Sequence, residues 1–564
     1  MDFTEPARST TLSANFVVLK GGTKIEPLVC KWPAWPHLIA PACYAMNAAY
    51  RHLPMLRSFA AAPSVHIAAT TDPALFGGPF VALREANVPA VLELIREINV
   101  RCARLLSFAR EFREFDEHLQ ANARGFALDE FYRTMPRHLS GIAEIVYDLN
   151  NHPRIRIVEE LMYEGEIDNR DVQEICLHAT PDSERDFFMS TPLLKSPGRL
   201  FLNLPFDDPR IDEIVAMRQH PTAAEHAREL LTDQGSGAAP PALLVNELPP
   251  RRVTRYDGSA VRVRYFGHAC VLLQTQRTSI LLDPVTAWER SAPLAQFTFD
   301  DLPDHIDQMI VTHSHLDHFA PEFLLQLRQR VRQTIVPACD RGNLADPSMR
   351  LILKRLGYSN IASVAAFERI PNTEGEIVSL PFVGEHAGLD IASKHCVAVR
   401  ILGRQFVFLV DSDGIDANLY RQTARRIGPV DALFLGMECN GAPLTWMYGP
   451  LLTRPPARRD DESRRLSGAN CERAWNMARA FDCKRVFVYA MGQEPWLKRL
   501  MGLQYTPESV QIAESEEFLR RCRSENLPAE RLYGCREFFF DLTTCSEQHL
   551  SPPPTLRCPL TAPQ

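Results

Sequence analysis

The sequence predicts an α+β protein of two unlike halves: a mixed, largely helical N-terminal domain, and a C-terminal domain of two packed sheets covered by outer helices. Three observations support this prediction. Apolar residues recur every three or four positions in the first half, whereas short β-branched runs separated by turns dominate the second. A stretch rich in Gly, Ala and Pro, residues 233–252, separates them. A chain of 564 residues also exceeds one ordinary core.

We therefore divide the chain into four segments. An N-terminal domain is expected over residues 1–235, with a role in dimerisation or in forming a substrate channel. A linker is expected over 236–255, the second domain over 256–542, and a loosely ordered tail over 543–564, which contains a run of three prolines.

In the N-terminal half, extended pieces are expected near Asn15–Leu19 and Ser64–Ala69. The clearest element begins near Pro89, where helical spacing predicts one long core helix, with contact to a second copy as the alternative. Its apolar stripe consists of Val91, Ile95, Ile98, Cys102, Leu105, Phe112, Phe115 and Leu119.

In the C-terminal half, β-branched runs predict a series of strands. They lie at Val261–Tyr265, Cys270–Gln274, Ser279–Leu282, Met309–Thr312, Cys396–Leu402, Phe406–Val410, Ala432–Leu435 and Val486–Tyr489. Helices are expected at Pro321–Arg332, Ala417–Ile427 and Glu472–Phe481, and after Pro507 with Val510, Ala513 and Phe518 facing inward.

A dense cluster of metal-ligand side chains follows the apolar run that ends at Val311. The segment Thr312–Phe319 contains His313, His315, Asp317 and His318. Alternate residues of an extended segment share a face, so the first three can point one way while a turn brings in His318. Imidazoles and carboxylates are the usual ligands of Zn, Fe and Mn, so the cluster predicts a site for one or two metal ions.

Composition excludes several other classes of function. The formal charge of -7 offers no general attraction to nucleic acid or to an anionic membrane. The 14 cysteines are scattered without a CxxC pair, which is typical of reduced thiols in the cytoplasm. No basic region followed by an apolar core opens the chain, and no apolar stretch is long enough to span a bilayer.

Two further polar points, Gly384–Gly388 and Asp411–Gly414, stand where strands should end. With the HxHxDH cluster, Gly267–Ala269 and Leu281–Pro284, they make the region from Arg262 to Tyr489 resemble the metallo-β-lactamase fold. That resemblance implies an αββα sandwich in which Asp283 supports the ligand loop without binding metal.

The sequence departs from the zinc hydrolases of that fold at two points. No histidine lies between His395 and His549, so Met491 or Gly492 stands where the terminal histidine ligand is expected. Of the adjacent Glu385 and His386, only one should reach the metals if the segment is extended. A zinc hydrolase would use His386, whereas Glu385 would give an oxygen-rich set that favours iron or manganese.

The carboxylate-rich variant with a long N-terminal domain resembles the family of the diiron β-hydroxylase of chloramphenicol biosynthesis, over nearly the whole chain. The resemblance implies that His313, His315 and Glu385 hold one iron, and that Asp317, His318 and Asp411 hold the other, with Asp411 as the bridge. It also implies an oxo-bridged pair of Fe ions, O2 as cosubstrate, an external electron donor, and hydroxylation of the β-carbon of an amino acid on a carrier domain of a nonribosomal peptide synthetase.

Several assignments stay open on the sequence. Glu438 is a candidate exchangeable ligand or a neighbour of the ligands, and Ala442–Gly449 could line the substrate channel. His268 is expected to be structural near the site. Arginines that could dock an acidic carrier domain lie in two runs: Arg251, Arg252, Arg255, Arg262 and Arg264, and Arg454, Arg458, Arg459, Arg464 and Arg465. The rival function is a zinc-dependent lactonase or phosphodiesterase with His386 as ligand and an activated water as nucleophile.

Overall fold

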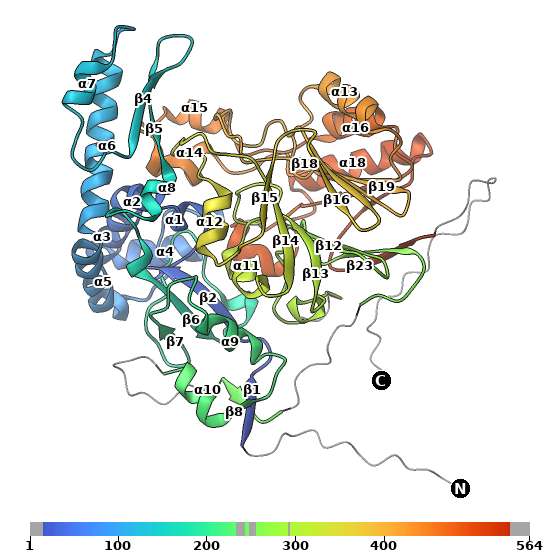
Figure 1. The fold of residues 1–564 in the computed structure, drawn as a ribbon, viewed down its shortest axis with the longest axis horizontal. Helices are drawn as coiled ribbons and strands as arrows, with labels where there is room; N and C mark the ends of the chain where they lie inside the picture. The colour runs from blue at the N-terminus through green and yellow to red at the C-terminus, as the bar shows by residue number, and fades with distance from the viewer. Residues whose placement is uncertain (1–14, 233–242, 248–254, 291–293, 503, 542–564) are drawn as a thin grey trace.

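The computed structural model describes residues 15–232, 243–247, 255–290, 294–502 and 504–541. The second half forms the expected αββα sandwich, whose two sheets pack face to face (Figure 1). Most of the predicted linker and the whole predicted tail from residue 543 lie outside the described residues. Between the gaps in the linker, the short strand β9 (Leu244–Val245) pairs with β1 (Phe16–Leu19) of the N-terminal domain.

Each sheet of the sandwich has seven strands. In spatial order the first contains β15 (Ile361–Val364), β14 (Val331–Pro337), β13 (Ile306–Ile310), β12 (Ser279–Leu282), β11 (Val271–Gln274), β10 (Val261–Tyr265) and β23 (Arg536–Phe540). The second contains β16 (Arg369–Asn372), β17 (Gly375–Leu380), β18 (Cys396–Ile401), β19 (Arg404–Phe408), β20 (Ala432–Gly436), β21 (Val486–Tyr489) and β22 (Ala529–Arg531). The two inner faces bury β-branched and aromatic side chains, among them Phe408 and Phe434, whose rings stack 4.6 Å apart.

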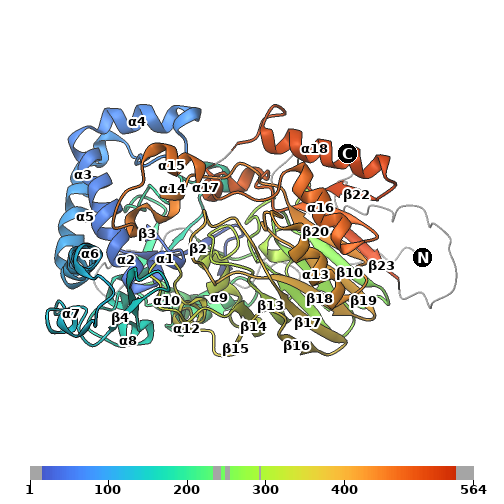
Figure 2. The same cartoon turned by 90° about the horizontal axis from the view of Figure 1, so that it is seen from above.

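Helices cover the outer face of each sheet. The second sheet is covered by α13 (Ala417–Ile427), α16 (Cys471–Phe481) and α18 (Val510–Ser524), as Figure 2 shows. The first sheet is covered by α11 (Pro321–Leu327) and α12 (Met349–Arg355), and its apolar outer face is continuous with the core of the N-terminal domain. The N-terminal domain therefore packs against the catalytic half over a shared hydrophobic core.

Parallel pairing places the polar loops at one edge. In the first sheet β12, β13, β14 and β15 run parallel, and in the second sheet β19, β20, β21 and β22 do so. The loops after β12, β13, β19, β20 and β21 begin at Asp283, Val311, Leu409, Met437 and Ala490. The carboxyl ends of parallel strands share an edge, where α/β proteins commonly bind ligands.

The N-terminal domain contains more sheet than the sequence suggested. Its four-stranded sheet has the order β3 (Trp32–Pro33), β2 (Lys24–Val29), β6 (Gln173–His178) and β7 (Leu200–Leu202). A separate hairpin consists of β4 (Ala143–Tyr147) and β5 (Pro153–Ile157), and β8 (Thr222–Ala223) pairs with β1. The longer helices are α2 (Pro41–Asn47), α3 (Leu53–Ala61), α4 (Pro63–Thr71), α5 (Val88–Arg101), α6 (Ala103–Asn122), α9 (Arg210–Ala216) and α10 (Ala224–Leu230).

Two predictions for this domain were wrong. Ser64–Ala69, expected to be extended, lies in α4, which Pro63 opens at its first position, where proline is well tolerated. The long helix from Pro89 is two helices, α5 and α6, because Cys102 between them leaves the helical conformation with φ -102° and ψ 17°. Most of the predicted stripe is still buried, so the periodicity identified the core face.

Two predictions for the C-terminal domain also fail in part. The helix expected over Pro321–Arg332 ends at Leu327, because Val331 begins β14 and pairs with Ile306 in the parallel ladder. Tertiary pairing overrides the local helical pattern there. Helix α18 forms after Pro507, but Val510 and Ala513 are exposed. Its buried face contains Ile512, Ser515, Phe518, Leu519 and Cys522, a stripe offset from the predicted one.

No helix among the described residues is both long and apolar enough to cross a bilayer.

Two buried histidines make stability depend on pH. Burial lowers the pKa of His37 to about 3, although its ring bonds the carbonyl of Ala345, and burial lowers the pKa of His395 to about 3. The unfolded chain protonates both rings below pH ~6.5 while the folded protein does not. Because the unfolded state binds more protons, stability is complete above that pH and falls below it, by about 1.4 kcal/mol per pH unit for each ring.

This expectation is checked by urea denaturation of the metal-free protein at pH 7.5 and pH 5. His395→Gln should reduce the pH dependence of the unfolding free energy by the share of one ring. An unchanged pH dependence in that variant would contradict the assignment.

Candidate metal centre

The ligand loop is held by one carboxylate at the end of β12. Asp283 Oδ1 accepts a hydrogen bond from the Thr312 backbone N–H at 2.8 Å, and Oδ2 accepts one from the Thr312 hydroxyl at 2.7 Å. Oδ2 also lies 2.9 Å from Nδ1 of His318. The contact with Nδ1 of His318 directs Nε2 of that ring into the site, as carboxylates often do for metal-binding histidines. Asp283 thus supports the loop, as the fold resemblance implied.

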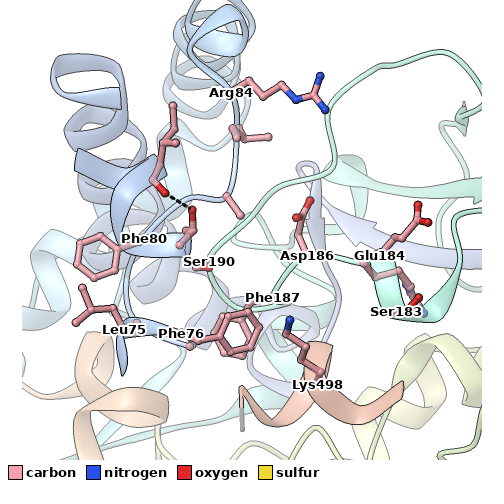
Figure 3. Close-up of a pocket in the computed structure, with 17 residues that line it drawn as sticks. Leu75, Phe76, Phe80, Arg84, Ser183, Glu184, Asp186, Phe187, Ser190 and Lys498 are labelled. Carbon is pink, nitrogen blue, oxygen red and sulfur yellow. Dashed lines mark hydrogen bonds between the residues drawn. The ribbon is translucent and has the colours of Figure 1, made fainter. Parts of the chain in front are cut away.

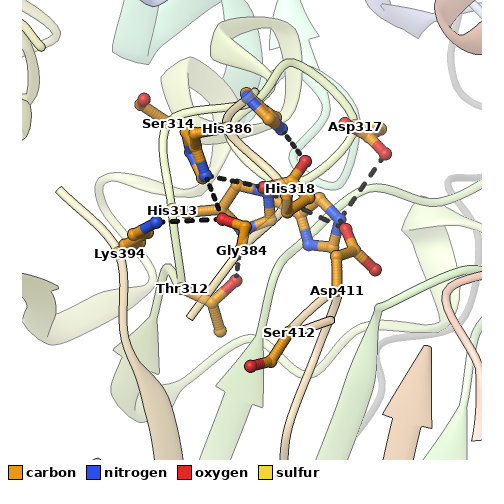
Figure 4. A network of polar contacts seen from close by, with 12 residues as sticks. Thr312, His313, Ser314, Asp317, His318, Gly384, His386, Lys394, Asp411 and Ser412 are labelled. Atoms are coloured by element: carbon orange, nitrogen blue, oxygen red, sulfur yellow. Dashed lines mark hydrogen bonds and ion pairs between the residues drawn. The ribbon is translucent and has the colours of Figure 1, made fainter. Parts of the chain in front are cut away.

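The sequence suggested that the ligand loop is extended, but in the structure it is not. β13 ends at Ile310, and the backbone N–H groups of His318 and Phe319 both bond the carbonyl of His315, which closes a turn. In consequence His313 and His315 face Glu385, whereas Asp317 lies beside His318 (Figure 4). The cluster converges as predicted, but turn geometry brings it together.

The segment Gly384–Gly388 is a strained turn. Glu385 and Ala387 have φ values of 63° and 52°, a region that non-glycine residues rarely occupy. A Cβ at Gly384 would lie 2.1 Å from the Asp413 carboxyl carbon, so only glycine fits there. The extended conformation assumed for this segment was therefore wrong, although only Glu385 of the two belongs to a group of potential metal donors. His386 Nδ1 lies 2.9 Å from Glu385 Oε2, and its ring stacks on His315 at 4.3 Å.

The Asp411 carboxylate lies near both His313 and His318. Its Oδ2 is 2.8 Å from Nε2 of His318 and 3.8 Å from Nε2 of His313. The residue before it, Val410, has a φ of 52°, which turns the chain sharply at the end of β19. Asp411 is thereby the carboxylate nearest to both parts of the cluster.

The donor atoms fit a pair of metal ions. Three groups of side chains place one donor atom each within 4.8 Å of one another: His313, His315 and Glu385; His313, His318 and Asp411; and His268, Asp317 and His318. Among the described residues, Nε2 of His313, Nε2 of His318, Oε2 of Glu385 and Oδ1 of Asp411 are buried without a hydrogen bond. Buried polar atoms rarely stay unsatisfied, so these atoms point to bound cations.

The electrostatics of the cluster favour cations as well. Burial opposes the charged form of His318, yet Asp411, Asp317 and Asp283 together hold its pKa well above the usual value. Burial raises the pKa of Glu438 well above the usual range, and Asp317, Asp411 and Glu385 raise it further. So many carboxylates in a buried space require either protons or metal ions for neutralisation.

His268 occupies a distinct place behind Asp317. Its Nδ1 accepts a hydrogen bond from the backbone N–H of Gly492 at 3.2 Å, so the ring proton lies on Nε2. Nε2 is 3.0 Å from Asp317 Oδ2, and the side chain is fully buried. A proton on Nε2 cannot coexist with a metal bond at that nitrogen. This geometry makes His268 a donor that positions Asp317, as the sequence analysis expected of a structural residue.

A matched pair of variants tests this role. His268→Gln keeps an N–H donor near the position of Nε2, whereas His268→Ala removes it. We expect His268→Ala to weaken one of two metal sites by roughly 10- to 100-fold in a chelator competition, and His268→Gln to retain most of the affinity. Equal losses in both variants would contradict the donor role.

A cavity of about 520 Å³ opens onto the cluster. His315, Asp317, Glu385, Asp411 and Glu438 form its polar wall. Four residues of the loop expected to line a channel, Ala442, Pro443, Trp446 and Met447, do line it. Residues Leu75–Phe80 of the N-terminal domain complete the wall, so both domains build the cavity.

Tyr448 lies in the predicted channel-lining segment 442–449, but its contact with His315 was not predicted, and neither was the presence of Tyr505 or of residues 75–80 at the site. The Tyr448 hydroxyl lies 3.2 Å from Nε2 of His315, and the buried Tyr505 hydroxyl, close to Glu438, has no hydrogen bond among the described residues. No spacing rule marks either tyrosine, and nothing in the glycine-rich 75–80 loop signals its distant contact with the cluster.

The arginine runs give a mixed outcome. Arg262 and Arg264 form ion pairs with the Glu537 carboxylate, at 3.7 Å and 2.7 Å. Arg465 lines the cavity. Arg251 and Arg252 lie outside the described residues.

Comparison with known proteins agrees with this geometry. A family model described as the N-terminal domain of diiron non-haem β-hydroxylases matches residues 18–249, and a β-lactamase superfamily domain model matches residues 262–391. A 4-amino-L-phenylalanyl-[CmlP-peptidyl-carrier-protein] 3-hydroxylase of Streptomyces venezuelae is 33% identical over 522 residues, which is 91% of this chain and 98% of that protein.

Solved structures extend the similarity to the whole fold. The crystal structure of CmlA, a diiron β-hydroxylase from Streptomyces venezuelae, superposes with a TM-score of 0.85 at 31% identity, covering 94% of this chain and 100% of that one. A mutant of the CmlA β-hydroxylase gives a TM-score of 0.84 at 31% identity, with coverages of 93% and 100%. The chain therefore belongs to the diiron non-haem β-hydroxylases, enzymes with a dedicated N-terminal domain, a metallo-β-lactamase-type domain and two iron ions.

Proposed function

We propose that this enzyme hydroxylates the β-carbon of an amino acid held as a thioester on a nonribosomal peptide synthetase carrier domain, within antibiotic biosynthesis. The observation that carries the proposal is the carboxylate-rich cluster at the floor of a cavity built by both domains. Its relative in Streptomyces venezuelae is named for 3-hydroxylation of a carrier-bound aminoacyl group. The reaction consumes O2 and two electrons and releases one oxygen atom as water.

We assign one iron to His313, His315 and Glu385, and the other to Asp317, His318 and Asp411, with Asp411 shared. The bound irons supply O2 activation and the oxidation of an unactivated C–H bond, which redox-inert zinc cannot supply. Asp283, Tyr448 and His268 orient His318, His315 and Asp317 by the contacts described above. These contacts fix the ligand side chains before substrate binds.

Glu438 is proposed to hold a proton beside the cluster. Its carboxyl group lines the cavity together with Asp317, Asp411 and Glu385, which favour its protonated form along with burial. The oxygen atom released as water requires two protons, and Glu438 is placed to provide one of them. The aromatic and apolar wall, which includes Phe76, Phe80 and Trp446, would exclude bulk water from the reacting carbon.

The proposal includes an electron-transfer partner and a cytoplasmic location. None of the 12 cysteines of the described residues is in a disulfide, which suits a reducing compartment. Pairing as a homodimer through the N-terminal domain remains part of the proposal. The zinc-hydrolase alternative is not favoured, because the solved structure that matches nearly the whole chain is a diiron β-hydroxylase, and because no histidine lies between His395 and His549.

The decisive experiment combines metal analysis with product detection. We expect two Fe per chain with a near-ultraviolet oxo-bridge band, and one added oxygen atom on an aminoacyl carrier protein by mass spectrometry, dependent on reductant and O2. Stoichiometric zinc with turnover of a lactone or phosphodiester in the absence of reductant would overturn the proposal.

A further inference from the structure

A second cavity lies directly behind the wall of the first. It has a volume of about 360 Å³ and shares Leu75, Phe76, Gly77, Gly78 and Phe80 with the metal-site cavity. One short loop of the N-terminal domain thus separates the two spaces. Figure 3 shows the second cavity, with Phe76, Phe187 and Lys498 at one side and Asp186 above them.

The separating loop rests on the catalytic domain at a small contact. Trp446 Nε1 donates a hydrogen bond to the Gly77 carbonyl at 2.8 Å. A Cβ at Gly77 would lie 3.4 Å from Gly502, so the two backbones touch, and φ values of +83° and +62° suit glycine at both positions. Trp446 and Gly502 line the metal-site cavity, and Phe187, 5.5 Å from the Trp446 ring, lines the outer one. The partition therefore consists of aromatic rings and glycine backbone.

Of the three cations that line the outer cavity, Arg185 is paired with Glu322, whereas Lys498 and Arg84 have no carboxylate partner among the described residues. Lys498 is half-buried with its ammonium 4.7 Å from the Phe76 ring centroid, and Arg84 is exposed. Neither forms an ion pair with the carboxylates of the described residues, and the Asp186 carboxylate, whose pKa burial raises, has no ion pair or hydrogen bond there.

Three other cations of the same domain interface pair with carboxylates, whereas Arg51 donates to the Trp446 carbonyl. Lys24 lies 3.1 Å from Glu289, Arg185 lies 2.7 Å from Glu322, and Arg499, directly after Lys498, pairs with Glu26. A half-buried lysine left unpaired beside such a network indicates an anion supplied by a ligand.

We propose that the outer cavity binds the phosphate-bearing part of the substrate's phosphopantetheine arm, with Lys498 and Arg84 facing the phosphate. This inference rests on the proposed function, in which a thioester on a long arm has to reach the metal-binding side chains that line the inner cavity. The arm carries one phosphate, one hydroxyl and two amides, followed by the thioester. The phosphate matches the two cations, and the amide N–H groups match the acceptor oxygens of Asp186 and Ser190. For the thioester end to enter the metal-site cavity, the contact between Gly77 and Gly502 has to open.

The test measures binding, separately from turnover. The probes are free 4′-phosphopantetheine, pantetheine without phosphate, and a carrier protein with and without its arm, each titrated against the iron-loaded enzyme. Lys498→Gln should weaken 4′-phosphopantetheine and the arm-bearing carrier by about tenfold, the worth of one charge-assisted hydrogen bond. Binding of pantetheine and of the carrier without its arm should stay unchanged. Lys484→Gln, which changes a surface lysine paired with Asp431, is the matched control.

A second variant tests the space instead of the charge. Ala82 lines the outer cavity and does not line the metal-site cavity, so Ala82→Trp should obstruct the arm while leaving two irons per chain and the folded-state circular dichroism intact. If Lys498→Gln binds 4′-phosphopantetheine as tightly as the unchanged enzyme, or Ala82→Trp binds the arm-bearing carrier normally, the assignment is wrong. In that event hydroxylation by the unchanged enzyme would still stand, whereas absence of hydroxylation on every aminoacyl carrier would refute the proposed function itself.

Discussion

Asp411→Ala will abolish hydroxylation, with a fall in turnover of roughly a thousandfold or more, and will disturb both metal sites at once. Its Oδ2 lies 2.8 Å from Nε2 of His318 and 3.8 Å from Nε2 of His313, and these two histidines are proposed to hold different irons. Losing a carboxylate–metal interaction is worth several kcal/mol, and each 1.4 kcal/mol corresponds to a factor of ten. Iron content per chain and the intensity of the near-ultraviolet band should both fall.

The control for this prediction lies two residues further along the same loop. Asp413 is also buried, but its Oδ1 accepts a hydrogen bond from the Ile415 N–H at 2.9 Å and it belongs to none of the three donor groups. Asp413→Asn keeps that acceptor and should retain iron to within about twofold. If Asp413→Asn lost iron as completely as Asp411→Ala, the effect would reflect collapse of the loop and not ligation.

Glu385→Ala and His386→Ala should separate clearly, although the two residues are adjacent. Glu385 contacts both His313 and His315 and belongs to a donor group, so its loss should remove about one iron per chain and turnover with it. His386 belongs to no donor group and stacks on His315, so its loss should leave most of the iron bound. Colorimetric iron analysis with Mössbauer spectroscopy distinguishes one remaining site from two.

The opposite pattern would reverse the ligand assignment. Loss of metal in His386→Ala with retention in Glu385→Ala would restore the histidine-rich set expected of a zinc hydrolase. Glu385→Gln adds a further comparison, because it preserves the shape of the side chain in its left-handed turn while removing the charge.

Local patterns in the sequence predicted much of the catalytic domain. Strand β21 and helix α13 match their predicted bounds, since a β-branched run between turns and a helical stripe with an Asp416 cap need little outside information. The Asp416 carboxylate accepts hydrogen bonds from the N–H groups of Asn418 and Leu419. The strand at Val331–Pro337 was not predicted, because its pairing with β13 is a distant contact that local periodicity does not reveal.

In the site too, sequence motifs predicted some features, whereas others depend on contacts between residues far apart in the chain. The candidate ligands were predicted from the HxHxDH spacing and from the polar ends of later strands, and the structure brings their side chains close together. The orientation of Glu385 depends on a left-handed turn at Gly384, and the tautomer of His268 depends on the distant backbone of Gly492. The wall supplied by residues 75–80 depends on how the two domains pack, which no single-sequence pattern encodes.

The Gly492 backbone also bears on whether one substitution could add a histidine at this edge of the site. A histidine there would have to adopt a φ of +68°, and its Cβ would meet the Met501 methyl group at 3.0 Å. It would also disturb the N–H that fixes His268, and through it Asp317. A single Gly492→His substitution would therefore weaken the support of an existing carboxylate before it could add a ligand.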